Sequence, residues 1–415
     1  MSLLRSRPAG LLALFTLAVS TWFAPAGATD APAPTGTTPP VARTYYESLD
    51  MSSPQASATR FVQAWVAQDF MAVHLLLSPQ GEWDASRAID DYTPQRLVPG
   101  FDESDHKVSP VYQRPAQGAE ASHDDAAPIS EVDFDPTRRF DALMLGAAQR
   151  GKLPFVLTSE TLVEVGKADD TQATVTLKTP KAETLTMSLL RQPSGRWKVD
   201  QVRWPGASIA AHPWDGESGQ AQGASSLKPA AAPAGTPRTF YDALDMSSPD
   251  TTVQAFMHAW SHGDYFASYH LLSPGAEWDA MAAIGALRME QLIPGFTLND
   301  LDLSPLAKKT ERSREDIARG VAPTNEYNFD NARQFDTLLV GAAVLKKLPF
   351  AITAATQAEP AKVDGNRATT VLRTPDAPDL SVTLVKLPSD RWKVERIRWV
   401  GSSDRLRPWG ATAGR

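Results

Sequence analysis

The chain has 415 residues, with 41 basic and 48 acidic side chains and a formal net charge of −7. It contains no cysteine, which excludes disulfide bonds, thiolate metal sites and cysteine nucleophiles. The acidic balance offers no basic stripe to a phosphate backbone or an anionic bilayer, so we expect no nucleic-acid partner and no electrostatic membrane binding.

Residues 1–28 have the pattern of a secretory signal peptide. Arg5 and Arg7 precede an apolar run at 11–23, and Ala26-Gly27-Ala28 supplies a small-x-small cleavage site. The run is shorter than the roughly 20 apolar residues that span a bilayer. We therefore expect cleavage after Ala28, no remaining transmembrane segment, and a periplasmic or secreted protein of the bacterial envelope. The alternative is an uncleaved N-terminal anchor.

A duplication dominates the rest of the chain. Residues 44–214 recur at 239–409, a shift of 195 positions without insertion or deletion. We therefore predict two whole domains, called copy one (44–214) and copy two (239–409) below. The Pro/Ala-rich stretch 29–43 is expected to be a disordered tail, 215–238 a flexible linker, and 410–415 a C-terminal tail.

Each copy begins with two predicted helices. Ser53-Pro54 has the form of an N-cap followed by proline in the first turn, and Phe61, Ala64 and Trp65 mark one helical face. A second helix is expected over 70–77, ending at Ser78-Pro79. The same signals recur in copy two.

The remainder of each copy predicts one more helix and then strands. A variable segment at 102–130 is followed by a third helix over 135–150. Segments rich in Val, Thr, Leu and Trp, separated by short turns, predict strands at 155–165, 173–178, 185–191 and 196–204. Strands joined by short turns form an antiparallel meander. Each copy is thus predicted to be α+β, with about three helices packed on a curved antiparallel sheet.

The order of three motifs resembles a known family. The motifs are Ala-Trp-x-x-x-Asp-Phe at 64–70, Leu-Leu-Ser-Pro at 76–79 and Gly-Arg-Trp-Lys-Val at 195–199, with near-identical counterparts in copy two. They resemble NTF2-like domains, which share the SnoaL/ketosteroid-isomerase-like fold. The resemblance implies two tandem cone-shaped domains, each with a pocket at its wide end. The family contains isomerases, dehydratases, ligand-holding proteins and interaction modules, so function stays open.

Histidine gives no chemistry common to both copies, because none of the seven histidines is matched in the other copy. His74, opposite Tyr269 in copy two, is the best candidate for a site in one copy. The alternative is a hydrogen-bonded helix histidine. An isomerase of the resembled type would need a carboxylate base and a proton donor, and the paired tyrosine is Tyr46/Tyr241.

Most of the acids present in both copies have structural interpretations. Asp69 is predicted to be a turn or cap residue after the first helix, Asp135 to cap the third helix, and Asp141 to pair with Arg138 three residues before it. The repeated Glu-Trp-Asp motif, at 82–84 and 277–279, suits the rim of a ligand pocket. Its alternative is a tryptophan that plugs the cone end between solvated acids. Pro213-Trp214 is expected to fold back as a lid.

These patterns favour a non-catalytic periplasmic binding or scaffold protein that holds a small amphipathic ligand or an envelope partner protein. The alternative is an isomerase- or dehydratase-like enzyme using a pocket carboxylate with Tyr or His. A third possibility is an intramolecular pseudo-dimer of the two domains. No catalytic residue, cofactor or metal site is predicted. The candidate ligand-binding residues are Tyr46, His74, Glu82, Trp83, Asp84, Tyr241, Tyr269, Glu277, Trp278 and Asp279.

Overall fold

The computed structural model describes residues 42–112, 130–132, 134–180, 184–216, 237–301, 325–327, 329–403 and 406–410. The predicted signal peptide, most of the tail and linker, and the last five residues lie outside these ranges. The chain divides into two units, Met1–Val41 and Ala42–Arg415, and the second contains both copies.

Copy one is mixed α+β, as predicted. Its helices are α1 (Tyr45–Ser48), α2 (Pro54–Val66), α3 (Phe70–Leu76), α4 (Pro79–Asp90), α5 (Glu103–Val108) and α6 (Pro136–Gln149). Its strands are β1 (Leu162–Ala168), β2 (Gln172–Lys178), β3 (Thr184–Arg191) and β4 (Trp197–Arg203). Each strand pairs antiparallel with the next, in the order β1-β2-β3-β4, so the predicted meander is confirmed.

Copy two repeats this plan. Its helices are α7 (Phe240–Ala243), α8 (Pro249–Ser261), α9 (Tyr265–His270), α10 (Pro274–Gly285), α11 (Leu298–Leu301) and α13 (Asn331–Val344). Its strands are β5 (Gln357–Ala358), β6 (Lys362–Asp364), β7 (Arg367–Arg373), β8 (Leu380–Lys386) and β9 (Trp392–Arg398). The order is β5-β7-β8-β9, and β6 also pairs with β7.

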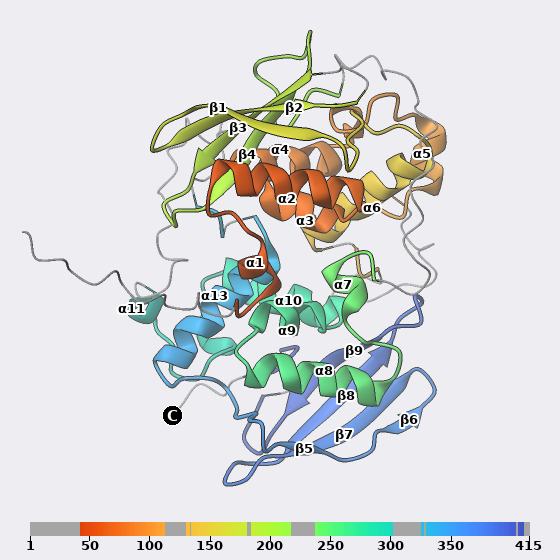
Figure 1. Ribbon diagram of the computed structural model, residues 1–415. Coiled ribbons are helices and arrows are strands. Elements are labelled where there is room, and N and C mark those ends of the chain that lie inside the picture. The colour runs from red at the N-terminus through yellow and green to blue at the C-terminus, as the bar shows by residue number, and fades with distance from the viewer. Residues whose placement is uncertain are drawn as a thin grey trace, which may run out of the picture. The chain divides into compact units, whose positions relative to one another are not determined.

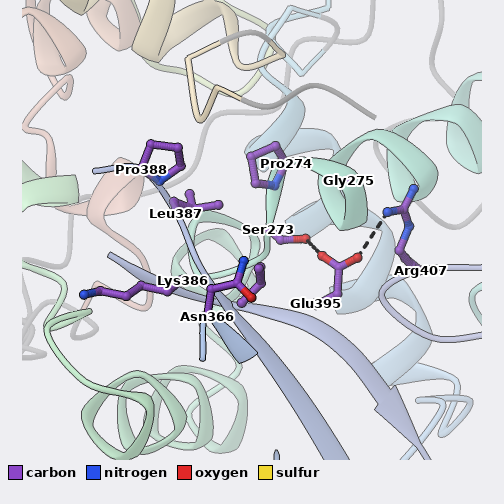
Figure 2. A pocket seen from close by; sticks show the side chains of 10 residues that line it. Ser273, Pro274, Gly275, Asn366, Lys386, Leu387, Pro388, Glu395 and Arg407 are labelled. Atoms are coloured by element: carbon purple, nitrogen blue, oxygen red, sulfur yellow. Dashed lines mark hydrogen bonds and ion pairs between the residues drawn. The ribbon is translucent and has the colours of Figure 1, made fainter. Parts of the chain in front are cut away.

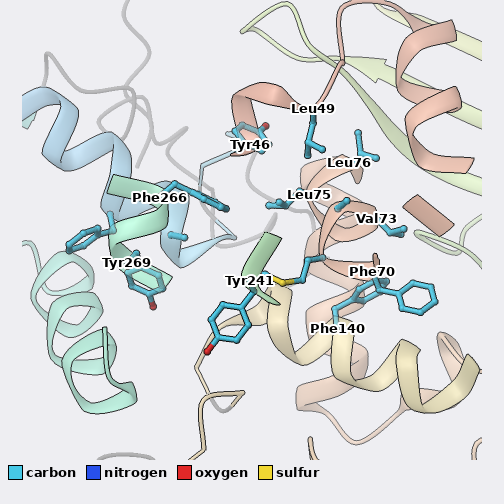
Figure 3. Packing of buried hydrophobic residues seen from close by; sticks show 14 of the residues in the cluster. Tyr46, Leu49, Phe70, Val73, Leu75, Leu76, Phe140, Tyr241, Phe266 and Tyr269 are labelled. Carbon is cyan, nitrogen blue, oxygen red and sulfur yellow. The ribbon is translucent and has the colours of Figure 1, made fainter. Parts of the chain in front are cut away.

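One face of each sheet is buried by helices. The burial of β2 alternates, with Ala173, Val175 and Leu177 inside, as the period of a half-buried strand requires. Helix α2 lies across the first sheet and α8 across the second (Figure 1). Buried side chains of both copies belong to one hydrophobic cluster, part of which is drawn in Figure 3.

The predicted helix caps are confirmed. Asp69 caps α3 through the N–H of Ala72 (3.0 Å), and Asp135 caps α6 through the N–H of Arg138 (2.9 Å). Trp214 folds back onto the domain, as predicted, and its ring packs in the core against Trp65 and Phe155. Trp214 is 1% exposed, and its indole N–H donates to the carbonyl of Leu97 (2.9 Å).

Two local predictions are wrong. Ser78-Pro79 ends α3 but also starts α4, because the Ser78 hydroxyl accepts the N–H of Gly81 (3.1 Å) and Pro79 occupies the first turn. The Glu-Trp-Asp motif therefore lies on a helix that was not predicted. The first strand begins at Leu162 and not at Phe155. Phe155 instead stacks on Trp65 with ring centroids 4.2 Å apart.

Candidate functional site

Tyr46 and Glu82, two of the predicted ligand-binding residues, belong to a buried charge network. Helix α1 places Tyr46 so that its hydroxyl donates to Glu326 of copy two (2.7 Å). Glu82, in the first turn of α4, accepts from Lys198 (3.1 Å) and from Arg333 of copy two (2.8 Å). Arg196 contacts Glu326 at 3.3 Å. The members of this first network are Tyr46, Glu82, Arg196 and Lys198 of copy one with Glu326 and Arg333 of copy two.

A second network uses the same six positions with the roles of the copies exchanged. Tyr241 donates to Glu131, and Arg138 donates to Glu277. Arg391 lies 3.5 Å from Glu131. The members are Tyr241, Glu277, Arg391 and Lys393 of copy two with Glu131 and Arg138 of copy one. The contacts between the copies thus have local two-fold pseudo-symmetry.

Burial controls the protonation of these groups. It raises the pKa of Glu277 to about 7 against the opposing effects of Arg138 and Lys393. It lowers the pKa of Lys393 to about 7 and that of Lys198 to about 8. Burial also raises the pKa of Tyr46, so this hydroxyl keeps its proton and donates it to Glu326. The Tyr46 hydroxyl and the carboxylates of Glu82 and Glu277 each have a bonded partner in the networks, although one oxygen of Glu277 has none among the described residues.

The structure places His74 in the interior. The ring is fully buried, its Nδ1 lies 3.0 Å from the Thr137 hydroxyl, and that hydroxyl donates to Asp330 of copy two (2.6 Å). Burial lowers the pKa of His74 to about 3. This arrangement fits the alternative of a hydrogen-bonded helix histidine. Its counterpart Tyr269 is also fully buried, with its ring 5.5 Å from that of Phe335.

The tryptophans of the repeated motif contact the opposite copy. The Trp83 ring lies 5.2 Å from Phe329, and the Trp278 ring lies 4.7 Å from Phe134. Trp278 is 48% exposed, whereas Trp83 is half-buried. In copy one the guanidinium of Arg87 stands 5.9 Å over the Trp83 ring.

The aspartates of the motif bind within their own copies. Asp84 accepts from Gln80 (2.8 Å), and Asp279 accepts from Arg407 (2.9 Å). Within each motif the glutamate binds cations of the charge network, the tryptophan contacts a phenylalanine of the opposite copy, and the aspartate binds a residue of its own copy. The motif does not form a single binding rim.

Sequence reasoning missed a further pair of ion pairs, made by Arg43, the last residue of the predicted tail, and Arg238, the last residue of the predicted linker. Arg43 donates to both carboxylate oxygens of Asp336 (2.7 Å each), and Arg238 binds Asp141 in the same way (2.7 and 2.6 Å). The predicted Asp141–Arg138 ion pair is therefore wrong, because Asp141 binds Arg238 and Arg138 binds Glu277. The rings of Tyr45 and Phe240, one from each copy, stack with their centroids 4.8 Å apart.

A cavity of about 170 Å³ lies at this contact between the copies. Its lining includes Tyr46, Arg196, Phe266 and Arg333. It is smaller than the roughly 300–1,000 Å³ typical of small-molecule sites. Tyr46 is the one predicted site residue in its lining.

A larger groove, of about 500 Å³, lies in copy two between the first turn of α10 and the β8–β9 turn (Figure 2). The hydroxyl of Ser273 donates to Glu395, and Arg407 contacts the other oxygen of Glu395 at 3.1 Å. The walls combine polar and apolar groups. They are Ser273, Pro274, Gly275, Asn366, Val385, Lys386, Leu387, Pro388, Glu395 and Arg407.

The matching position in copy one carries Ser78, Asp200 and His212. Ser78 donates to Asp200 (2.7 Å), and His212 Nδ1 lies 3.6 Å from that carboxylate. His212 Nε2 faces the amide of Gln201 (3.0 Å) and not the serine. In a hydrolase triad the serine hydroxyl is hydrogen-bonded to the histidine that accepts its proton. Here the serine bonds to the aspartate instead, so these residues do not form a triad. Gln80 stands here where copy two has Gly275.

The described residues contain no group of three or more His, Asp or Glu that could hold a metal ion. Within the same ranges no helix is long and apolar enough to cross a bilayer. Comparison of the chain with protein-family models, with curated proteins and with solved structures gave no match.

Proposed function

We propose that this protein is a non-catalytic binding scaffold of the bacterial envelope whose two copies, each an NTF2-like cone, work as one intramolecular pseudo-dimer. The observation that carries the proposal is the pair of buried charge networks, each built from both copies. Helices α2 and α4, packed against the four-stranded antiparallel meander of copy one, support the NTF2-like assignment.

Each network pairs charges from both copies, so separation of the copies would break buried ion pairs such as Arg333–Glu82. Arg333 is 2% exposed and Glu82 is fully buried, and removing one partner of such a pair costs about 3–5 kcal/mol. The linker keeps the copies at a high effective concentration, which favours their association within one chain.

Binding is favoured over catalysis because the candidate acid–base groups are bonded to other side chains of the charge networks. Tyr46 donates to Glu326, and Glu82 is held by two cations. The groove beside Gly275 offers about 500 Å³ with apolar walls and a few polar groups, which suits a small amphipathic ligand. The other occupant compatible with a scaffold is an envelope partner protein.

Cleavage of the linker tests the pseudo-dimer. A protease site introduced within 217–236 of the full chain should be cut without releasing either half during gel filtration. Halves that separate, and that keep their circular dichroism and unfolding midpoint when apart, would refute the proposal. Native mass spectrometry of gently purified protein tests the ligand, and Gly275→Gln is the matched variant for the groove.

A further inference from the structure

The two sheets differ at their first edge. In copy one, β1 runs without a break over Leu162–Ala168. In copy two the same stretch is split into β5 and β6, and Pro360 stands where copy one has Val165. After this position both edge strands show the same shift in pairing register with their neighbour. The exchange of Val165 for Pro360 is therefore the clearest difference between the two edges.

The backbone at this position faces away from the sheet. The N–H of Glu359 donates inward to the carbonyl of Val371 (2.9 Å), so its neighbour Pro360 faces outward by the alternation of an antiparallel ladder. Copy one has the matching register, with Glu164 opposite Thr176. Val165 therefore directs its N–H and carbonyl outward, whereas Pro360 has no N–H to offer.

The neighbouring outward position supports this orientation. The side-chain amide of Gln55 reaches the Val163 carbonyl from outside the sheet, at 3.4 Å. Val163 and Val165 thus direct peptide groups outward along one line, where the Gln55 amide contacts the Val163 carbonyl. Leu162 is 61% and Val165 is 41% exposed.

The opposite edge of the same sheet is covered by the chain itself. The carbonyl of Val199 in β4 accepts from Ser78 (2.6 Å), and the N–H of Val202 donates to Pro213 (2.8 Å). Among the described strands of copy one, β1 is the edge left without such cover. Proteins usually protect an edge of this kind with proline or charge, as copy two does with Pro360.

We propose that the β1 edge binds an extended segment of a partner protein that carries basic residues and adds a strand to the sheet. Four exposed acids surround the edge, against Lys167 and Lys178; the acids are Glu160, Glu164, Asp169 and Asp170. The chain's net charge of −7 opposes pairing with a second copy of itself. Glu164 already pairs with Lys178 across β1 and β2 (2.7 Å). The partner strand places a second basic residue opposite Glu164, between apolar residues opposite Val163 and Val165.

The proposal stands apart from the pseudo-dimer, because the edge belongs to copy one alone. The probes are two fluorescent peptides, one of alternating valine and lysine and one of alternating valine and glutamate, titrated into the full chain. The lysine peptide should bind by fluorescence anisotropy, and it should slow hydrogen exchange at the amides of Val163 and Val165. The glutamate peptide should bind at least tenfold more weakly.

Two reciprocal variants give the matched control. Val165→Pro should weaken binding of the lysine peptide at least tenfold, since it removes the outward N–H without breaking a bond of the sheet. Pro360→Val should create a second binding site in copy two. If Val165→Pro fails to fold, Glu164→Lys serves instead, and it should reverse the preference between the two peptides.

Three results would overturn the proposal: unchanged affinity in folded Val165→Pro, exchange protection elsewhere than β1, or self-association of the chain that Val165→Pro abolishes. None of them affects the linker-cleavage test, so the two proposals fail separately.

Discussion

Replacement of Arg333 by methionine tests the energetic role of the first charge network. The guanidinium donates to Glu82 (2.8 Å) and to the Glu326 carbonyl, and it lies 4.9 Å above the Tyr46 ring. Methionine keeps much of the side-chain volume but leaves Glu82 with Lys198 as its remaining cation (3.1 Å).

The expected loss is large because the pair is buried. Burial already raises the pKa of Glu82, and Arg333 is the strongest influence opposing that rise. Breaking a buried pair from one side costs about 3–5 kcal/mol, whereas replacing both partners can be close to neutral. Arg333→Met should therefore lower the free energy of unfolding by about 3–5 kcal/mol. The double variant with Glu82→Gln should lose at least about 1 kcal/mol less than the sum of the single variants.

The assay is urea unfolding at pH 7, followed by tryptophan fluorescence and circular dichroism. Arg138→Met, alone and with Glu277→Gln, is the matched pair in the second network. Single and double variants that add within about 0.5 kcal/mol would show that the charges do not depend on each other, which would contradict the reasoning.

Three further predictions concern other parts of the molecule. Burial lowers the pKa of His74 from 6.5 to about 3, so its contribution to stability is present above pH 6.5 and is lost as the pH falls toward 3. His74→Gln should flatten that decline by up to about 1.4 kcal/mol per pH unit between pH 6.5 and 5, and an unchanged pH profile of urea unfolding would contradict this. Phe240→Ala removes the stack on Tyr45, and a double-mutant cycle with Tyr45→Ala should give a coupling of about 0.5–1.5 kcal/mol; a coupling near zero would remove the stack from the interface energetics. Gly275→Gln should leave folding intact, with up to about 1 kcal/mol of added helix stability, and should reduce retention of any ligand seen by native mass spectrometry; full retention would place that ligand outside the groove.

Local patterns in the sequence predicted the capped helices and the meander because those features depend on neighbouring residues. Helix α4 was missed because Ser78-Pro79 terminates one helix and begins the next. The identical signature at Ser53-Pro54 only begins a helix, α2. Where a helix ends immediately before a cap, the same two residues support both interpretations.

The partners of the Glu-Trp-Asp motif could not be predicted in this way. Glu82 and Arg333 are 251 positions apart, and no periodicity connects them. One signal was available: Arg138 and Arg333 each lie in the first turn of a helix, where a positive charge is unfavourable. A cation repeated at such a position in both copies indicates a carboxylate from elsewhere in the fold.

The exchange of roles between the two networks also determines which changes the chain can tolerate. In a dimer of identical subunits the two networks have the same sequence, so every substitution changes both of them at once. Here Glu82 and Glu277 are separate positions, so one network can be altered while the other still holds the copies together. The same independence allows one half to carry Gly275 where the other has Gln80, and Val165 where the other has Pro360. A single chain can thus keep a symmetric interior and still present two different outer surfaces.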